Sequence, residues 1–215
     1  MTAFTSVVLD VDSTVSAIEG IDWLAERRDA STTATVVALT ADAMEARVPL
    51  DEVYGRRLAI IRPTRDEIAQ LAQVYITAAM PGVRDAVAAW TAAGVRVVLV
   101  SGGLRDAILP LATWLRIPAA DVHAVDVAFD EDGIVTGVRD DAPLARHGGK
   151  PIVVEALHLA RPILAVGDGA TDAELAPVVD QFLAFTGVAR RASVVARAAG
   201  EVESFAALTP IVLGF

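Results

Sequence analysis

The sequence predicts an α/β fold with a Rossmann-like parallel sheet that carries helices on both faces. Short apolar, β-branched runs end in polar or glycine-rich residues at 6–9, 95–100, 163–166 and 181–185. Helix-like stretches lie between them, at 82–93, 105–115 and 151–159. Continuous apolar strands that alternate with helices are typical of a parallel sheet buried on both sides. Ligands of such sheets bind beyond the carboxyl ends of the strands, so the residues after each strand are the candidates for function.

The stretch from about 16 to 79 departs from this alternation. Its pattern predicts helices at 42–47, 50–61 and 65–75, with Pro49 and Pro63 near helix ends. We therefore expect a helical cap at 16–79, inserted after the first strand of an α/β core made of 1–15 and 80–215. An acidic turn, Asp130-Glu131-Asp132-Gly133, interrupts the apolar segment 125–138 and predicts a small β-hairpin there.

Composition and charge exclude several classes of function. The 215 residues carry a formal charge of -10 and a pI of about 4.7, which disfavours nucleic acids and anionic membranes as partners. The absence of cysteine excludes disulfides and thiolate metal sites. No apolar run approaches the roughly 20 residues that span a bilayer, and the first residues lack the basic region of a signal peptide. We expect a cytoplasmic protein.

Two carboxylates follow the first predicted strand, in Asp10-Val11-Asp12-Ser13-Thr14. On extended chain, residues two apart point the same way, so Asp10 and Asp12 would lie together at the strand end. A bound cation would relieve their repulsion. A solvated turn, in which Asp and Ser are common, explains this segment equally well when it is taken alone.

Ser101-Gly102-Gly103 follows the second of these runs, and Lys150 lies at another predicted helix start. A hydroxyl and backbone N–H groups at a helix start can bind phosphate, although an ordinary N-cap has the same sequence. Lys150 is the only lysine among 18 basic side chains, and its charge opposes the helix macrodipole at that position. This unfavourable placement suggests a function for Lys150, whereas we interpret the nearby His147 as a surface residue.

The segment Gly167-Asp168-Gly169-Ala170-Thr171-Asp172 follows a further strand. Asp168 and Asp172 would share a helix face if a helix begins here, and like charges on one face need a cation between them. An acidic first helical turn is the alternative, and it accounts only for Asp172. Together, these strand-end sites supply hard oxygen ligands that favour Mg²⁺. The lysine and the hydroxyl complement phosphate, and a carboxylate could serve as a nucleophile.

This set of motifs resembles the haloacid dehalogenase-type phosphatases, whose four motifs appear here in order as 10–14, Ser101, Lys150 and 167–172. More narrowly, the chain resembles the phosphoserine phosphatase family along nearly its whole length. Glu19-Gly20-Ile21-Asp22, Arg56-Arg57-Leu58-Ala59 and Gly148-Gly149-Lys150 carry this closer likeness.

The resemblance implies a role for each matching residue. Asp10 would be the nucleophile and Asp12 the general acid and base. The implied ligands of Mg²⁺ are Asp10, the backbone carbonyl of Asp12, Asp168 and Asp172. The implied phosphate-binding residues are Ser101, Gly102, Gly103 and Lys150. For the substrate, Glu19 would bind the ammonium group and Arg57 the carboxylate, with Leu50 and Thr171 nearby.

The chain also departs from the family pattern. Leu50 stands where a Phe is usual, Thr171 stands where many members have Asn, and Val125-Asp126 replaces an Asn-Arg pair. Ala17 and Ile18 replace polar residues before Glu19. No catalytic group is lost. The substitutions at Leu50 and Asp126, however, affect the expectation that serine is the leaving group.

The function implied is hydrolysis of L-phosphoserine through an aspartyl phosphate on Asp10, as in serine biosynthesis. An alternative keeps this chemistry and changes the substrate to a phosphosugar, phosphohomoserine or phosphoglycolate. A receiver-like module that holds phosphate on an Asp is a third reading, but receivers lack both a cap of this length and a second carboxylate like Asp12. An apolar surface on the cap would allow a homodimer.

Overall fold

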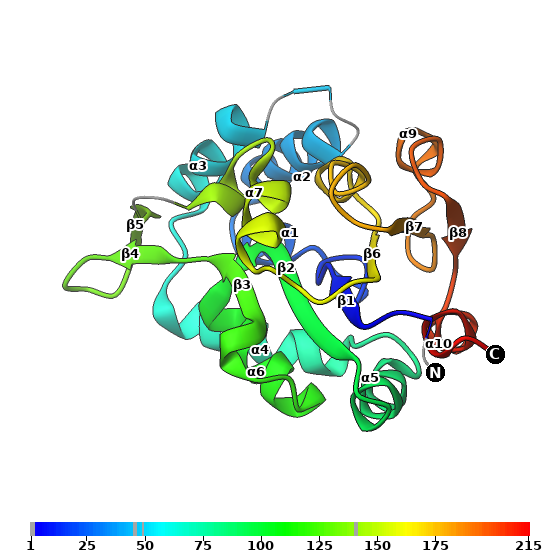
Figure 1. Cartoon of the computed structure of the whole chain (residues 1–215). Coiled ribbons are helices and arrows are strands. Elements are labelled where there is room, and N and C mark those ends of the chain that lie inside the picture. Colours follow the sequence, from blue (N-terminus) through cyan, green and yellow to red (C-terminus); the bar gives the residue numbers. More distant parts are fainter. Residues whose placement is uncertain (1–2, 45–46, 49, 140–141) are drawn as a thin grey trace.

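The computed structural model describes residues 3–44, 47–48, 50–139 and 142–215, apart from the side chains of Met44, Leu50, Asp51 and Glu52. Its centre is a six-stranded sheet with the order β3-β2-β1-β6-β7-β8 (Figure 1). The strands are β1 (Ser6–Leu9), β2 (Arg96–Leu104), β3 (Val122–Val125), β6 (Ile163–Gly167), β7 (Gln181–Phe185) and β8 (Gly200–Val202). All neighbouring strands pair in parallel, which confirms the predicted sheet.

The register of the central strands brings the ends of β1 and β6 to one edge of the sheet. Leu9 is aligned with Leu99 of β2 and with Val166 of β6. Every residue of β1 and β6 is buried, as expected for strands covered on both faces. The polar residues that follow these strands therefore meet at the same edge.

Helices cover both faces of this sheet (Figure 1). On one side lie α5 (Val83–Ala92), α6 (Arg105–Leu115) and α10 (Phe205–Leu213). On the other lie α7 (Gly149–Ala156) and α9 (Ala192–Val195), while the short α8 (Ala170–Ala173) follows β6. No helix in the described ranges is long and apolar enough to cross a membrane.

The predicted hairpin is confirmed as β4 (Val127–Phe129) paired with β5 (Val135–Val138). Two 3-10 turns complete this part of the chain: Ala119–Asp121 precedes β3, and Pro143–Ala145 lies between β5 and α7. Asp130 Oδ1 accepts hydrogen bonds from the backbone N–H groups of Asp132 and Ile134 at the tip. This is the local bonding for which Asp is favoured in turns.

Helices α1 (Gly20–Ala25), α2 (Ala30–Met44), α3 (Leu50–Ile61) and α4 (Arg65–Thr77) lie between β1 and α5. The expected helix at 42–47 is corrected, since α2 begins at Ala30 and the following residues 45–46 lie outside the described part. The first half of α2 is rich in Thr and Val, whose low helix propensity hides it in the sequence. The short helix α1 was not predicted, whereas α3 has the expected bounds.

Two backbone hydrogen bonds join the chain where it enters and leaves this helical segment. Ala17 N–H donates to Ala78 O at 2.9 Å, and Met80 N–H donates to Val15 O at 2.9 Å. Helix α4 packs along α6, which belongs to the layer that covers the sheet. The division of the chain into a core and a cap at 16–79 stays a prediction.

Two further expectations about the sheet were incomplete. Strand β2 runs to Leu104, so Ser101-Gly102-Gly103 forms the irregular last part of the strand rather than a turn at a helix start. Strands β3 and β8 were not predicted as strands. They have four and three residues, too few for a clear apolar pattern.

Candidate active site

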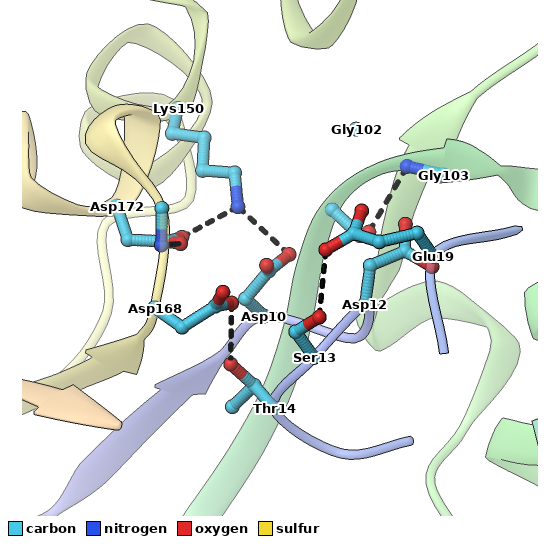
Figure 2. Close-up of polar contacts among 12 residues, drawn as sticks. Asp10, Asp12, Ser13, Thr14, Glu19, Gly102, Gly103, Lys150, Asp168 and Asp172 are labelled. Carbon is cyan, nitrogen blue, oxygen red and sulfur yellow. Dashed lines mark hydrogen bonds and ion pairs between the residues drawn. The ribbon is translucent and has the colours of Figure 1, made fainter. Parts of the chain in front are cut away.

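Three carboxylates form a buried cluster beyond β1 and β6. Asp10, Asp168 and Asp172 each offer an oxygen, and these atoms lie within 4.8 Å of one another. Thr14 Oγ1 donates to Asp168 Oδ1 at 3.1 Å, and Gly169 N–H donates to Asp172 Oδ2 at 2.9 Å (Figure 2). Helix α8 begins only at Ala170, so Asp168 and Asp172 do not share a helix face as expected. The loop before α8 brings them together instead.

Lys150 neutralises part of this cluster. It is the second residue of α7, and its Nζ atom lies 2.8 Å from Asp10 Oδ1 and 2.5 Å from Asp172 Oδ1 (Figure 2). Burial by itself would lower the pKa of Lys150, but the charges of Asp10 and Asp172 raise it above its usual value. The preceding Gly149 is required for this position, because a Cβ there would lie 1.8 Å from the backbone oxygen of Pro143.

The cluster remains short of positive charge. Burial, followed by the charge of Asp10, raises the pKa of Asp172 to about 7 even though Lys150 is in contact. Carboxylate oxygens are the ligands that hard divalent cations prefer. The three carboxylates could therefore hold a metal ion, which would relieve this repulsion. The metal contact expected for Asp12 is through its backbone carbonyl and stays a prediction.

Asp12 lies beside the cluster, and one of its carboxyl oxygens is held by two hydrogen bonds. Its Oδ1 atom accepts hydrogen bonds from the hydroxyl of Tyr75 at 2.7 Å and from Gly20 N–H at 2.9 Å. Burial and the charge of Asp10 raise the pKa of Asp12 to about 6. A carboxyl group whose pKa lies near the working pH is suited to both donating and accepting a proton.

Asp10, Asp12 and Lys150 line one pocket together with most of the residues expected to bind substrate, whereas Asp168 and Asp172 are not among its lining residues. The space between its lining atoms is about 500 Å³, part of it open to solvent. The lining residues are Asp10, Asp12, Glu19, Ile21, Ala43, Tyr54, Arg57, Gly102, Lys150 and Thr171. Leu50 begins α3, but its side chain lies outside the described residues.

Glu19, the residue that precedes α1, lines the pocket. Its Oε1 atom accepts a hydrogen bond from Ser13 Oγ at 2.6 Å (Figure 2). The same atom lies 3.8 Å from Arg191 Nη2. Burial, followed by the charge of Asp12, raises the pKa of Glu19 to about 8. A cation placed next to this carboxylate would stabilise its charged form.

Arg57 offers the opposite charge from α3. Its Nη1 donates to Thr40 Oγ1 at 2.9 Å, and Thr40 in turn donates to Asp22. The side chain of Arg57 is buried, yet its Nε finds no hydrogen-bond partner among the residues that the structure describes. A buried, unpaired donor is costly, and an acceptor on a bound ligand would satisfy it.

The end of β2 supplies polar groups to the same region. Gly103 N–H donates to Ser101 Oγ at 3.0 Å, so that hydroxyl can direct its own hydrogen elsewhere (Figure 2). Gly103 cannot be replaced without rearrangement, since a Cβ there would lie 2.9 Å from Ile108 Cδ1 and 3.1 Å from Asp12 Oδ2.

Three residues of this site were missed from the sequence. The hydroxyl of Tyr54 donates to Gly102 O at 2.6 Å, and that of Tyr75 donates to Asp12. Arg191, just before α9, contacts the carboxylates of Asp168 and Glu19. Nothing distinguishes Arg191 from the other arginines, but the two tyrosines are the only ones in the chain, which could have drawn attention to them.

Comparisons with known proteins agree with this geometry. The family model of the haloacid dehalogenase-like hydrolases matches residues 7–177. The chain is 37% identical to a phosphoserine phosphatase of Rattus norvegicus over 186 residues, covering 85% of this chain and 81% of the rat protein. The Homo sapiens phosphoserine phosphatase matches with the same identity and coverage.

Solved structures share the fold. A phosphoserine phosphohydrolase-like protein from Francisella tularensis superposes with a TM-score of 0.90 at 22% identity, covering 97% of this chain and 99% of that one. A substrate-bound phosphoserine phosphatase complex has a TM-score of 0.80 at 19% identity, covering 93% of each chain. By its sequence, its fold and the arrangement of its four motifs, the chain belongs to the haloacid dehalogenase-like hydrolases.

Proposed function

We propose that the protein hydrolyses L-phosphoserine to serine and phosphate through an aspartyl phosphate on Asp10. The observation that carries the proposal is that Glu19 and Arg57 line the same pocket as Asp10 and Lys150. A zwitterionic amino acid needs one group of each sign, and a phosphomonoester needs a nucleophile beside a cation. The names of the curated relatives support the same substrate.

In the first step, an oxygen of Asp10 attacks phosphorus and the bond from phosphorus to the serine oxygen breaks. Asp12 gives its proton to that oxygen, so serine leaves as the neutral alcohol. In the second step, Asp12 takes a proton from water, which attacks the aspartyl phosphate and frees both Asp10 and phosphate. Lys150 and Ser101 hold the oxygens of the transferring group, whose charge has to be neutralised throughout.

We further propose that the metal ion is Mg²⁺, held by the carboxylates of Asp10, Asp168 and Asp172 and by the backbone carbonyl of Asp12. The ion neutralises charge on the phosphoryl group and on the nucleophile. All of these ligands are hard oxygens, as Mg²⁺ requires, and a cation would offset the burial and the charge of Asp10 that raise the pKa of Asp172.

Residues 16–79 would act as a cap that closes over the substrate. Glu19 and Arg57 both come from this segment, whereas Asp10 follows β1 and Lys150 is the second residue of α7. Closure would place the two charges on the amino acid and exclude water. Partial proteolysis with and without substrate tests this, and unchanged cleavage within 16–79 would argue against closure.

The decisive measurement is phosphate release from a panel of small phosphomonoesters with Mg²⁺, with and without EDTA. We expect a strong preference for L-phosphoserine that is lost with EDTA and in Asp10→Asn. Activity on other esters but not on phosphoserine would keep Asp10 as nucleophile and discard the roles given to Glu19 and Arg57. No activity on any ester would refute the proposed chemistry.

A further inference from the structure

Both tyrosines of the chain reach from the helical segment 16–79 to the edge of the sheet, where Tyr54 contacts Gly102 of β2 and Tyr75 contacts Asp12 after β1. Tyr75, on α4, is fully buried and donates to Oδ1 of Asp12 at 2.7 Å. The same oxygen accepts Gly20 N–H at 2.9 Å. The other oxygen, Oδ2, lies beside Gly103, because a Cβ on that residue would be 3.1 Å from it.

Two glycines leave room for this hydroxyl. A Cβ at Gly20 would lie 2.0 Å from the Tyr75 hydroxyl oxygen, and one at Gly103 would lie 3.2 Å from it. Gly20 is the first residue of α1, in a conformation that other residues can adopt, since its φ is not positive. Its glycine is therefore explained by the space that Tyr75 occupies and not by backbone geometry.

Two donors on one carboxyl oxygen decide where the proton of that carboxyl sits. While the Tyr75 hydroxyl and Gly20 N–H both donate to it, Oδ1 of Asp12 has both lone pairs engaged, so a proton on the carboxyl group resides on Oδ2. The Tyr75 hydroxyl holds the carboxyl in this orientation through its hydrogen bond to Oδ1. Oδ2 lies beside Gly103 in the last part of β2, which also carries Ser101 and where the proposed function places the phosphoryl group.

We propose that Tyr75 is a positioning residue for leaving-group protonation: it orients Asp12 so that the proton on Oδ2 is delivered to the departing oxygen of the substrate. This inference rests on the proposed role of Asp12 as general acid. Helix α4 packs along α6, and its end is joined to the first strand's loop through Ala78 and Ala17. Tyr75 is thus held by the layer that covers the sheet.

The test compares two esters that differ in their need for a proton. Serine is a poor leaving group without protonation, whereas p-nitrophenolate leaves from p-nitrophenyl phosphate unaided. The quantity to compare is kcat/KM. It depends only on the steps up to the departure of the leaving group, and the later hydrolysis of the aspartyl phosphate, which both esters share, does not affect it. For Tyr75→Phe we expect kcat/KM to fall about 10- to 100-fold with L-phosphoserine, part of the usual general-acid contribution. With the aryl ester we expect it to change less than about 3-fold.

The matched control is Tyr54→Phe, which removes the other buried hydroxyl without touching Asp12. We expect this variant to lower kcat/KM by the same factor with both esters, as a change in binding or packing would. Thermal unfolding of each variant establishes that it is folded under the assay conditions. Equal losses with both esters in folded Tyr75→Phe would overturn the inference.

Asp12→Asn separates failure of the inference from failure of the proposed function. If Asp12→Asn shows the leaving-group dependence and Tyr75→Phe does not, Asp12 is the acid and Tyr75 does not position it. If Asp12→Asn shows no such dependence, Asp12 is not the acid and both proposals fall. Leaving-group dependence in both variants, but not in Tyr54→Phe, is the result that we expect.

Discussion

The Nζ atom of Lys150 lies 2.8 Å from Oδ1 of Asp10, across 140 residues of sequence. The chain uses arginine everywhere else, yet here a guanidinium would not fit. The ammonium is buried between Asp10 and Asp172 and contacts one oxygen of each. A compact point charge meets this geometry, whereas the planar fork of arginine needs more room.

Replacement of Lys150 by methionine should therefore destabilise the protein as well as inactivate it. Removing one partner of a buried ion pair leaves the other charge uncompensated, at a cost of about 3–5 kcal/mol in the free energy of unfolding. We expect a smaller cost at pH 5, since Asp172 has a pKa of about 7 and is then protonated. Urea unfolding of metal-free Lys150→Met at both pH values measures this; an equal cost at both would contradict it.

Metal binding should depend on pH in a defined direction. The pKa of Asp172 is raised to about 7, so its protonated form favours the metal-free fold, and that stability is lost as pH rises from about 4 to about 7. Magnesium needs the ionised carboxylate, so it should bind more tightly at pH 8 than at pH 5.5. We expect Mg²⁺ to raise Tm more at pH 8. Asp172→Asn, which cannot titrate, should lose most of this difference.

Arg57 should matter only for substrates that carry a carboxylate. We expect Arg57→Ala to raise KM for L-phosphoserine by about 100-fold, because a buried charge-assisted pair is lost. The KM for phosphoethanolamine, which has the ammonium and the phosphate but no carboxylate, should hardly change. Steady-state kinetics with the two esters measures this, and a similar rise for both would show that Arg57 supports the pocket and does not recognise the substrate.

Arg28 and Glu67 link the connection between α1 and α2 to α4 through two hydrogen bonds, at 2.6 and 2.8 Å. Hydrogen bonds from Arg28 lower the pKa of Glu67 to about 2. A lowered carboxyl pKa gives stability that is present above about 4.5 and is lost as pH falls toward 2. We expect Arg28→Met to reduce stability by about 1 kcal/mol at pH 7, with the difference fading in acid. Chemical unfolding of both proteins between pH 2.5 and 7 measures this. A difference in the free energy of unfolding that does not change with pH would show that the ion pair does not contribute to it.

Much of the fold was readable because its signals are local. The apolar runs of β1, β6 and β7 and the periodic pattern of α6 are set by neighbouring residues, and the structure confirms them. The first half of α2 was missed because its Thr and Val residues favour no helix by themselves. The short edge strands β3 and β8 become strands only through pairing with β2 and β7.

The sequence by itself determined the α/β class, the strand ends that carry Asp10 and Asp168, the helix start that carries Lys150, and the family to which these motifs point. Only the tertiary structure decided which side chains orient them. Tyr75 meets Asp12 across 63 residues, and Arg191 meets Asp168 from a loop with no motif of its own. Such contacts depend on how helices pack over the sheet, and residue type and spacing along the chain carry no record of that packing.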